Sequence, residues 1–173
     1  MRCGRSAALL VGVMQLACSA APDADEQPAA GLPDRDTFVT EGLATHAGSR
    51  AALRARLGEP DSVSRETVPN RHVPGVQDTL LTIQYPEVVA RLHKPGGGGE
   101  LLSSVRVASN DHLRYPLIGK SLSEVDAAFG APHDANDSTL IYRCGSCQGG
   151  DDPVEILIRD GVVYAVRFNF YVD

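Results

Sequence analysis

The chain has 173 residues, a formal net charge of −6 and a hydrophobic content of 43%. This length permits one domain or two small ones, and the hydrophobic content is sufficient for a packed core. An acidic chain without a stripe of basic residues repels phosphate backbones, so we expect no nucleic-acid partner.

Residues 1–21 have the features of an export signal. Arg2 and Arg5 form a short basic start. Residues 7–17 form an apolar run that is too short to cross a bilayer of roughly 30 Å as a helix. Small residues follow this run and permit cleavage. The segment therefore predicts an exported protein, either in the periplasm or secreted.

Cys18 allows a second way of processing this export signal, which is lipidation. Residues 15–18 resemble a bacterial lipobox, in which the cysteine becomes the lipidated first residue of the mature chain. Residues 22–33 are rich in Ala, Asp and Pro and are predicted to form a flexible tether. Lipidation of Cys18 followed by a tether would anchor the chain to the outer membrane. Ordinary cleavage would leave it soluble.

Capping residues and hydrophobic spacing predict three helices and six strands in the rest of the chain. The predicted helices span residues 34–48, 50–57 and 121–129. The predicted strands span residues 79–85, 88–93, 101–107, 139–143, 154–159 and 162–171, and residues 61–78 are predicted to form a loop. Alternation in the last strand predicts one face made of Val162, Tyr164, Val166, Phe168 and Phe170, with Arg167 and Asn169 facing solvent.

The helix over residues 121–129 has the clearest boundaries. Ser121 and Glu124 have the spacing of a capping box, which satisfies two free N–H groups at the helix start. Val125 and Phe129 lie on one apolar face, and Gly130 is placed to end the helix.

A fainter copy of this stretch lies 72 residues earlier in the chain. The matching pairs are Ser49 and Ser121, Leu53 and Val125, Leu57 and Phe129, Gly58 and Gly130, and Pro60 and Pro132. The predicted strands after each copy also correspond. The predicted fold class is therefore α+β, with two tandem repeats over residues 34–108 and 109–173. Each repeat is a helix plus a three-stranded antiparallel sheet, and the two repeats can share one sheet.

Residues 119–122 and 129–132, followed by a three-stranded meander, resemble the SmpA/OmlA (BamE-type) outer-membrane lipoprotein fold. The tandem arrangement resembles that of β-lactamase inhibitor proteins. This resemblance implies a non-enzymatic protein that binds another protein of the cell envelope, with no cofactor and no catalytic residue. It also leaves open a tandem inhibitor of a periplasmic enzyme.

Cys144 and Cys147 form a Cys-x-x-Cys pair. In an oxidising compartment a local disulfide is the default, and free thiols, a thiol-redox pair and a metal site are the alternatives. Redox chemistry favours a cysteine at a helix N-terminus, but this pair follows a predicted strand and precedes the acidic residues 151–152. Zinc would need two further ligands, and His133 is the only histidine nearby, so no metal site is predicted.

Four residues are candidates for contact with the partner. Tyr85 and Tyr142 are aromatic residues near strand ends, where a role in core packing is the alternative. Arg106 and Arg167 occupy matching positions in the two predicted repeats, and Arg167 is predicted to face solvent.

Overall fold

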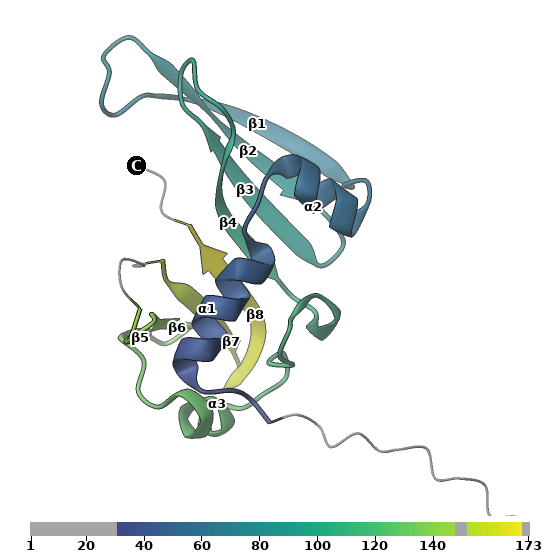
Figure 1. Ribbon diagram of the computed structural model, residues 1–173, viewed down its shortest axis with the longest axis vertical. Helices are drawn as coiled ribbons and strands as arrows, with labels where there is room; N and C mark the ends of the chain where they lie inside the picture. Colours follow the sequence, from purple (N-terminus) through teal and green to yellow (C-terminus); the bar gives the residue numbers. More distant parts are fainter. Residues whose placement is uncertain (1–30, 148–151, 171–173) are drawn as a thin grey trace, which may run out of the picture.

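The computed structural model describes residues 31–147 and 152–170 (Figure 1). The predicted export signal, Cys18 and the tether up to residue 30 lie outside the described residues. The helices are α1 (Arg35–His46), α2 (Arg50–Leu57), the short 3-10 helix η1 (Asn110–His112) and α3 (Leu122–Phe129). The strands are β1 (Ser62–Pro69), β2 (Gln77–Gln84), β3 (Val88–Lys94), β4 (Leu101–Val107), β5 (Asp134–Asn136), β6 (Thr139–Tyr142), β7 (Val154–Arg159) and β8 (Val162–Asn169).

All eight of these strands belong to one antiparallel sheet, in the order β1-β2-β3-β4-β8-β7-β6-β5. Strands β1 to β4 and strands β5 to β8 each form a meander of neighbours in sequence. The two meanders meet where β4 pairs with β8, with Arg106 opposite Arg167 and Val107 opposite Val166. The middle of the sheet is therefore built by two strands that are far apart in the chain.

The three α-helices begin and end where their capping residues place them. Asp34, Ser49 and Ser121 each accept a hydrogen bond from a backbone N–H in the first turn of the helix that follows. The capping box of Ser121 and Glu124 is complete. Gly58 and Gly130 follow α2 and α3 with positive φ angles of 81° and 67°, which favour glycine.

The helices all lie on one face of the sheet (Figure 1). Phe38 of α1 stacks on Phe129 of α3, with 4.7 Å between ring centroids. Phe129 makes an edge contact with Tyr142 of β6. Leu53 of α2 belongs to the same buried cluster. The other face carries no helix among the described residues, and this helix-free face is where polar side chains gather.

Helix α1 packs against the C-terminal meander, although it precedes the N-terminal one in sequence. Gly42 faces the ring of Phe168 in β8, and no room is left there for a side chain. His46, one turn later, stacks on the same ring with 4.3 Å between centroids. His46 is 2% exposed, and this burial, together with Arg56, lowers its pKa to about 4. It is therefore neutral at pH 7 and part of the core.

The predicted fold class is wrong. The described residues contain one eight-stranded sheet with three α-helices, and not two repeats of a helix plus three strands. Two strands were missed. β1 lies in the predicted loop 61–78, and its side chains are almost all exposed, so it has no apolar period. β5 is three residues long and fully exposed.

The predicted face of the last strand is wrong in its first half. Val166 and Phe168 are buried as expected, but Val163 and Ala165 are buried in place of Val162 and Tyr164. A register shift in the β7–β8 pairing inserts one extra residue at this point, and such a bulge exchanges the two faces of a strand. Tyr171 lies outside the described residues.

Candidate protein-binding face

The helix-free face of the sheet carries a row of side chains from its four central strands. The register places Val89, Arg106, Arg167 and Glu155 side by side across β3, β4, β8 and β7. Residues directly opposite each other in antiparallel strands point to the same face of the sheet. All four side chains are half-buried, so they form a surface and not a core.

Arg106 and Arg167 are like charges placed directly opposite each other. Such pairs destabilise a sheet unless they are compensated. Glu155 compensates only Arg167, through an ion pair of 2.7 Å between Arg167 Nη1 and Glu155 Oε2. The other carboxylate oxygen of Glu155 accepts a hydrogen bond of 2.9 Å from the side chain of Asn169. Glu155 is therefore already bonded through both oxygens.

Arg91 adds a third positive charge to this face. It lies opposite Ser104 in β4, which puts it diagonally next to Arg106. Within the described chain, neither the Arg91 nor the Arg106 guanidinium has a hydrogen bond or an ion pair. We call Arg91, Arg106 and Arg167 the arginine row. It is a positive patch on a chain whose net charge is −6.

The two candidate tyrosines lie on the helix-covered face and not beside the arginine row. Tyr142 is 1% exposed, and its hydroxyl donates a hydrogen bond of 3.2 Å to the carbonyl of Gly130. Burial is the main cause that raises the pKa of this phenol. Tyr85 is 5% exposed and lies below α2. The structure thus brings Arg106 and Arg167 together and leaves Tyr142 almost no surface for a partner.

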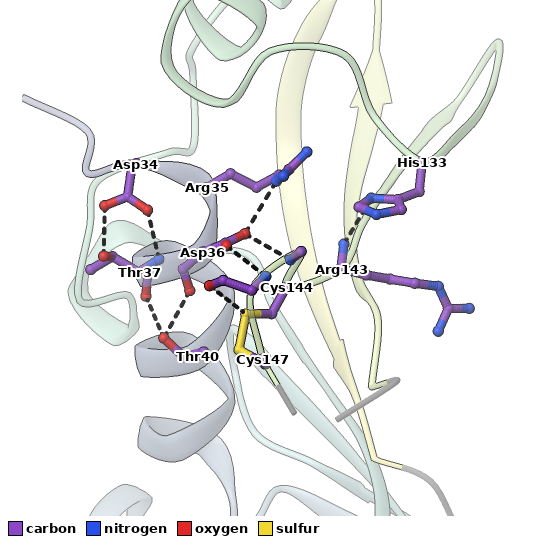
Figure 2. The surroundings of a disulfide bond; sticks show 11 residues. Asp34, Arg35, Asp36, Thr37, Thr40, His133, Arg143, Cys144 and Cys147 are labelled. Atoms are coloured by element: carbon purple, nitrogen blue, oxygen red, sulfur yellow. Dashed lines mark hydrogen bonds and ion pairs between the residues drawn. A yellow bond between two sulfur atoms is a disulfide. The ribbon is translucent and has the colours of Figure 1, made fainter. Parts of the chain in front are cut away.

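Cys144 and Cys147 are joined by a disulfide in the loop after β6, with 5.5 Å between their Cα atoms. Figure 2 shows this loop against the first turn of α1. The backbone N–H groups of Gly145 and Ser146 donate hydrogen bonds of 2.9 and 3.0 Å to the two carboxylate oxygens of Asp36. The disulfide therefore holds a tight loop whose N–H groups attach the loop to α1.

These contacts oppose the thiol-redox interpretation. A reactive cysteine needs a stabilised thiolate, which a helix N-terminus or a positive charge supplies. Here the N–H groups of the loop are directed at Asp36, and a nearby carboxylate disfavours a thiolate. The pair follows strand β6 and does not begin a helix. The geometry supports a structural role for this disulfide.

Asp36→Asn is expected to weaken the attachment of this loop and to speed reduction of the disulfide by dithiothreitol. The Ser146 hydroxyl and the Gly145 N–H are the main causes that hold the pKa of Asp36 well below its ordinary 3.8. An asparagine amide would place one N–H donor against another.

The stability that the Asp36 carboxylate contributes is expected to fall at low pH. Because the pKa is lower in the folded state, the carboxylate contributes its full stability above pH 3.8 and loses it as the pH falls further. The difference in Tm between the native protein and Asp36→Asn should thus be constant above pH 3.8 and shrink below it. Asp61→Asn serves as the control. An equal reduction rate in Asp36→Asn and the native protein would contradict the role given to Asp36.

In the part of the chain that the structure describes, no group of three or more His, Cys, Asp or Glu side chains lies together in a way that could hold a metal ion. Within the same residues, no helix is both long enough and apolar enough to span a membrane. Comparison of the chain with models of known families, with curated proteins and with solved structures found no match in any of the three.

Sequence reasoning missed Arg91, Glu155 and Asn169 as parts of the candidate face. Val89, Arg91 and His93 alternate with the buried Val88, Ala90 and Leu92 in β3, and this alternation separates the residues of the two faces. That signal assigns Arg91 to a face, but it does not show that β4 lies next to β8. The pairing of these two strands is what assembles the arginine row.

Proposed function

We propose that this chain is an exported, non-enzymatic binding protein of the bacterial cell envelope, whose helix-free sheet face receives an acidic surface of a partner protein. The observation that carries the proposal is the arginine row, in which Arg91 and Arg106 have no partner within the described chain. Unpaired arginines on a rigid sheet favour carboxylates, because a guanidinium can donate two parallel hydrogen bonds to one carboxylate. Lipidation of Cys18 would hold this domain at the outer membrane.

The dimensions of the face suit a protein partner. Eight strands at a spacing of about 4.8 Å, with an average length of about 20 Å, offer roughly 770 Å² on one side of the sheet. A standard protein interface covers about 800 Å² on each partner. Polar residues such as Thr82, Ser104 and Asn169 surround the arginines. Arginine is one of the residue types enriched in binding hot spots.

Reversing the charge of Arg91 and Arg106 together is expected to reduce capture of the partner at least about tenfold. Each buried arginine contact at an interface contributes roughly 1–2 kcal/mol or more, and 1.4 kcal/mol is a factor of ten. The experiment compares the native protein and the Arg91→Glu, Arg106→Glu double variant as baits in an envelope extract. Neither arginine forms an ion pair within the described chain, so the double variant should keep the native Tm.

Arg65→Glu is the matched control. Arg65 is exposed on the same sheet and changes charge by as much as either single substitution of the double variant. Its register opposite Leu81 places it on the helix-covered side. Capture should be unchanged in this variant. A double variant that captures its partner as well as the native protein would refute the proposed face.

Photocrosslinking locates the contact independently. A photoreactive amino acid at Ser104 lies within the helix-free face, whereas one at Thr40 lies on the exposed side of α1. We expect the captured protein to crosslink from position 104 and not from position 40. Crosslinks from position 40 alone would place the partner on the wrong side of the sheet.

A further inference from the structure

A pocket of about 500 Å³ lies between helix α2 and the sheet, on the side opposite the arginine row. Its lining includes Ile83 of β2, Tyr85 directly after β2, and Arg50 and Arg54 of α2. Pockets of this volume are typical of sites for small molecules. The proposed protein-binding face does not use this pocket.

The hydroxyl of Tyr85 is an unpaired polar group in this pocket. Tyr85 is 5% exposed, yet within the described residues its hydroxyl has no hydrogen bond. None of the buried side-chain N and O atoms of the described residues lacks a hydrogen-bond partner, so this hydroxyl is accessible from the pocket, where a ligand can accept a hydrogen bond from it. Burial is the main cause that raises the pKa of this phenol, so it stays protonated at neutral pH and is able to donate a hydrogen bond.

Arg50 supplies a second donor, which forms a long ion pair but no hydrogen bond within the described residues. Its Nη1 is 3.7 Å from the carboxylate of Glu100, which is too far for a hydrogen bond. Arg54 lies one helical turn further along α2, and both its Nε and Nη2 already donate to Glu59. The guanidinium of Arg50 and the hydroxyl of Tyr85 are therefore the groups that a ligand can satisfy.

We propose that this pocket binds a small amphipathic carboxylic acid, with its carboxylate between Arg50 and Tyr85 and its apolar body against Ile83. A carboxylate offers only acceptors, and its planar shape matches a guanidinium. Glu59 and Glu100 balance the two arginines of the pocket and disfavour a ligand with several negative charges, such as a phosphate ester. Ala51 and Pro60 extend the apolar lining.

The test is an NMR titration of the purified protein with three probes. Octanoate represents a free fatty acid, N-acetylphenylalanine represents a peptide C-terminus, and octanamide has the shape of octanoate without its charge. We expect saturable shifts of the Arg50 and Tyr85 resonances with at least one of the two acids, and at least tenfold weaker binding of octanamide. The acid that binds more tightly identifies the source of the ligand.

Two variants assign the binding groups. Tyr85→Phe keeps the ring and removes only the hydroxyl, and Arg50→Gln removes the guanidinium. Each is expected to weaken binding of the acid about fivefold to tenfold, whereas Arg65→Gln, outside the pocket, should not change it. Because the Tyr85 hydroxyl has no partner within the described chain, Tyr85→Phe should not lower the Tm.

The proposal is overturned if neither acid gives saturable shifts at millimolar concentration, if octanamide binds as well as octanoate, or if both variants bind the acid as the native protein does. The Arg91→Glu, Arg106→Glu double variant should bind the acid normally, since those residues lie on the opposite face of the sheet. The experiments can therefore refute the proposed acid-binding pocket and the proposed protein-binding face independently of each other.

Discussion

Gly42→Ala is expected to lower the free energy of unfolding by about 1–3 kcal/mol, through overpacking of the core. Alanine in the middle of a helix normally stabilises by about 1 kcal/mol relative to glycine. Here a methyl group on residue 42 would meet the Phe168 ring closer than 3.0 Å. That ring is 1% exposed and is held on its other side by the core, so it has little room to move. Overpacking therefore outweighs the gain in helix propensity.

Chemical denaturation of the native protein and the variant measures this difference. Gly99→Ala is the control, because a methyl group there meets nothing within 4 Å and its φ angle is not in the left-handed region. Combining Gly42→Ala with Phe168→Leu should cost less than the sum of the two single changes, since the smaller side chain makes room for the methyl group. A Gly42→Ala variant that is as stable as the native protein, or more so, would contradict the close packing of α1 on β8.

Residues 109–173 alone are expected not to fold, although the sequence predicts a boundary at residue 108. Phe129 and Phe168 would lose the cover of α1, which packs on both rings. Exposing a large apolar side chain costs roughly 1.5–3 kcal/mol, so two cost about 3–6 kcal/mol. A small domain has only about 5–15 kcal/mol of total stability. The isolated segment also lacks β4, the neighbour of β8.

Circular dichroism and denaturant titration of this fragment provide the measurement. We expect no cooperative unfolding transition in the fragment of residues 109–173 and one cooperative transition in the native protein. Adding a peptide of residues 31–48 in excess should restore part of the ordered signal, because it supplies the missing cover. A fragment that unfolds cooperatively without the peptide would show that the C-terminal meander is independent of α1.

The sequence was sufficient to predict the helices and strands that are specified by residues close together in the chain. The cap residues Ser49 and Ser121 predicted where the second and third helices begin, because capping involves neighbours in sequence. For the first helix, Asp34 and Asp36 were both possible caps, and Asp34 is the one that caps it. Strands β4 and β7 were predicted over the residues that form them, because their apolar residues face the core. The edge strand β1 gave no such signal, since pairing with β2 holds it in place while its side chains remain in solvent.

The candidate site depends on information that is not local. Arg106 and Arg167 were selected from the sequence, but their direct apposition comes from the pairing of β4 with β8. No pattern within either strand specifies that pairing. From their positions near strand ends, Tyr85 and Tyr142 were candidate contacts as well as candidate core residues, and the structure buries both under α2 and α3. The bulge in β8 likewise had no marker in the sequence.

The contact between α1 and β8 has a consequence for how fast the chain folds. The first helix and the last strand of the described chain must meet before the core is complete. Contacts between distant segments require closing a long loop of disordered chain, which costs entropy before any contact forms. Domains dominated by such contacts fold in milliseconds to seconds, far more slowly than helical bundles. During synthesis, α1 and the N-terminal meander must therefore wait for β8, with apolar surface still uncovered.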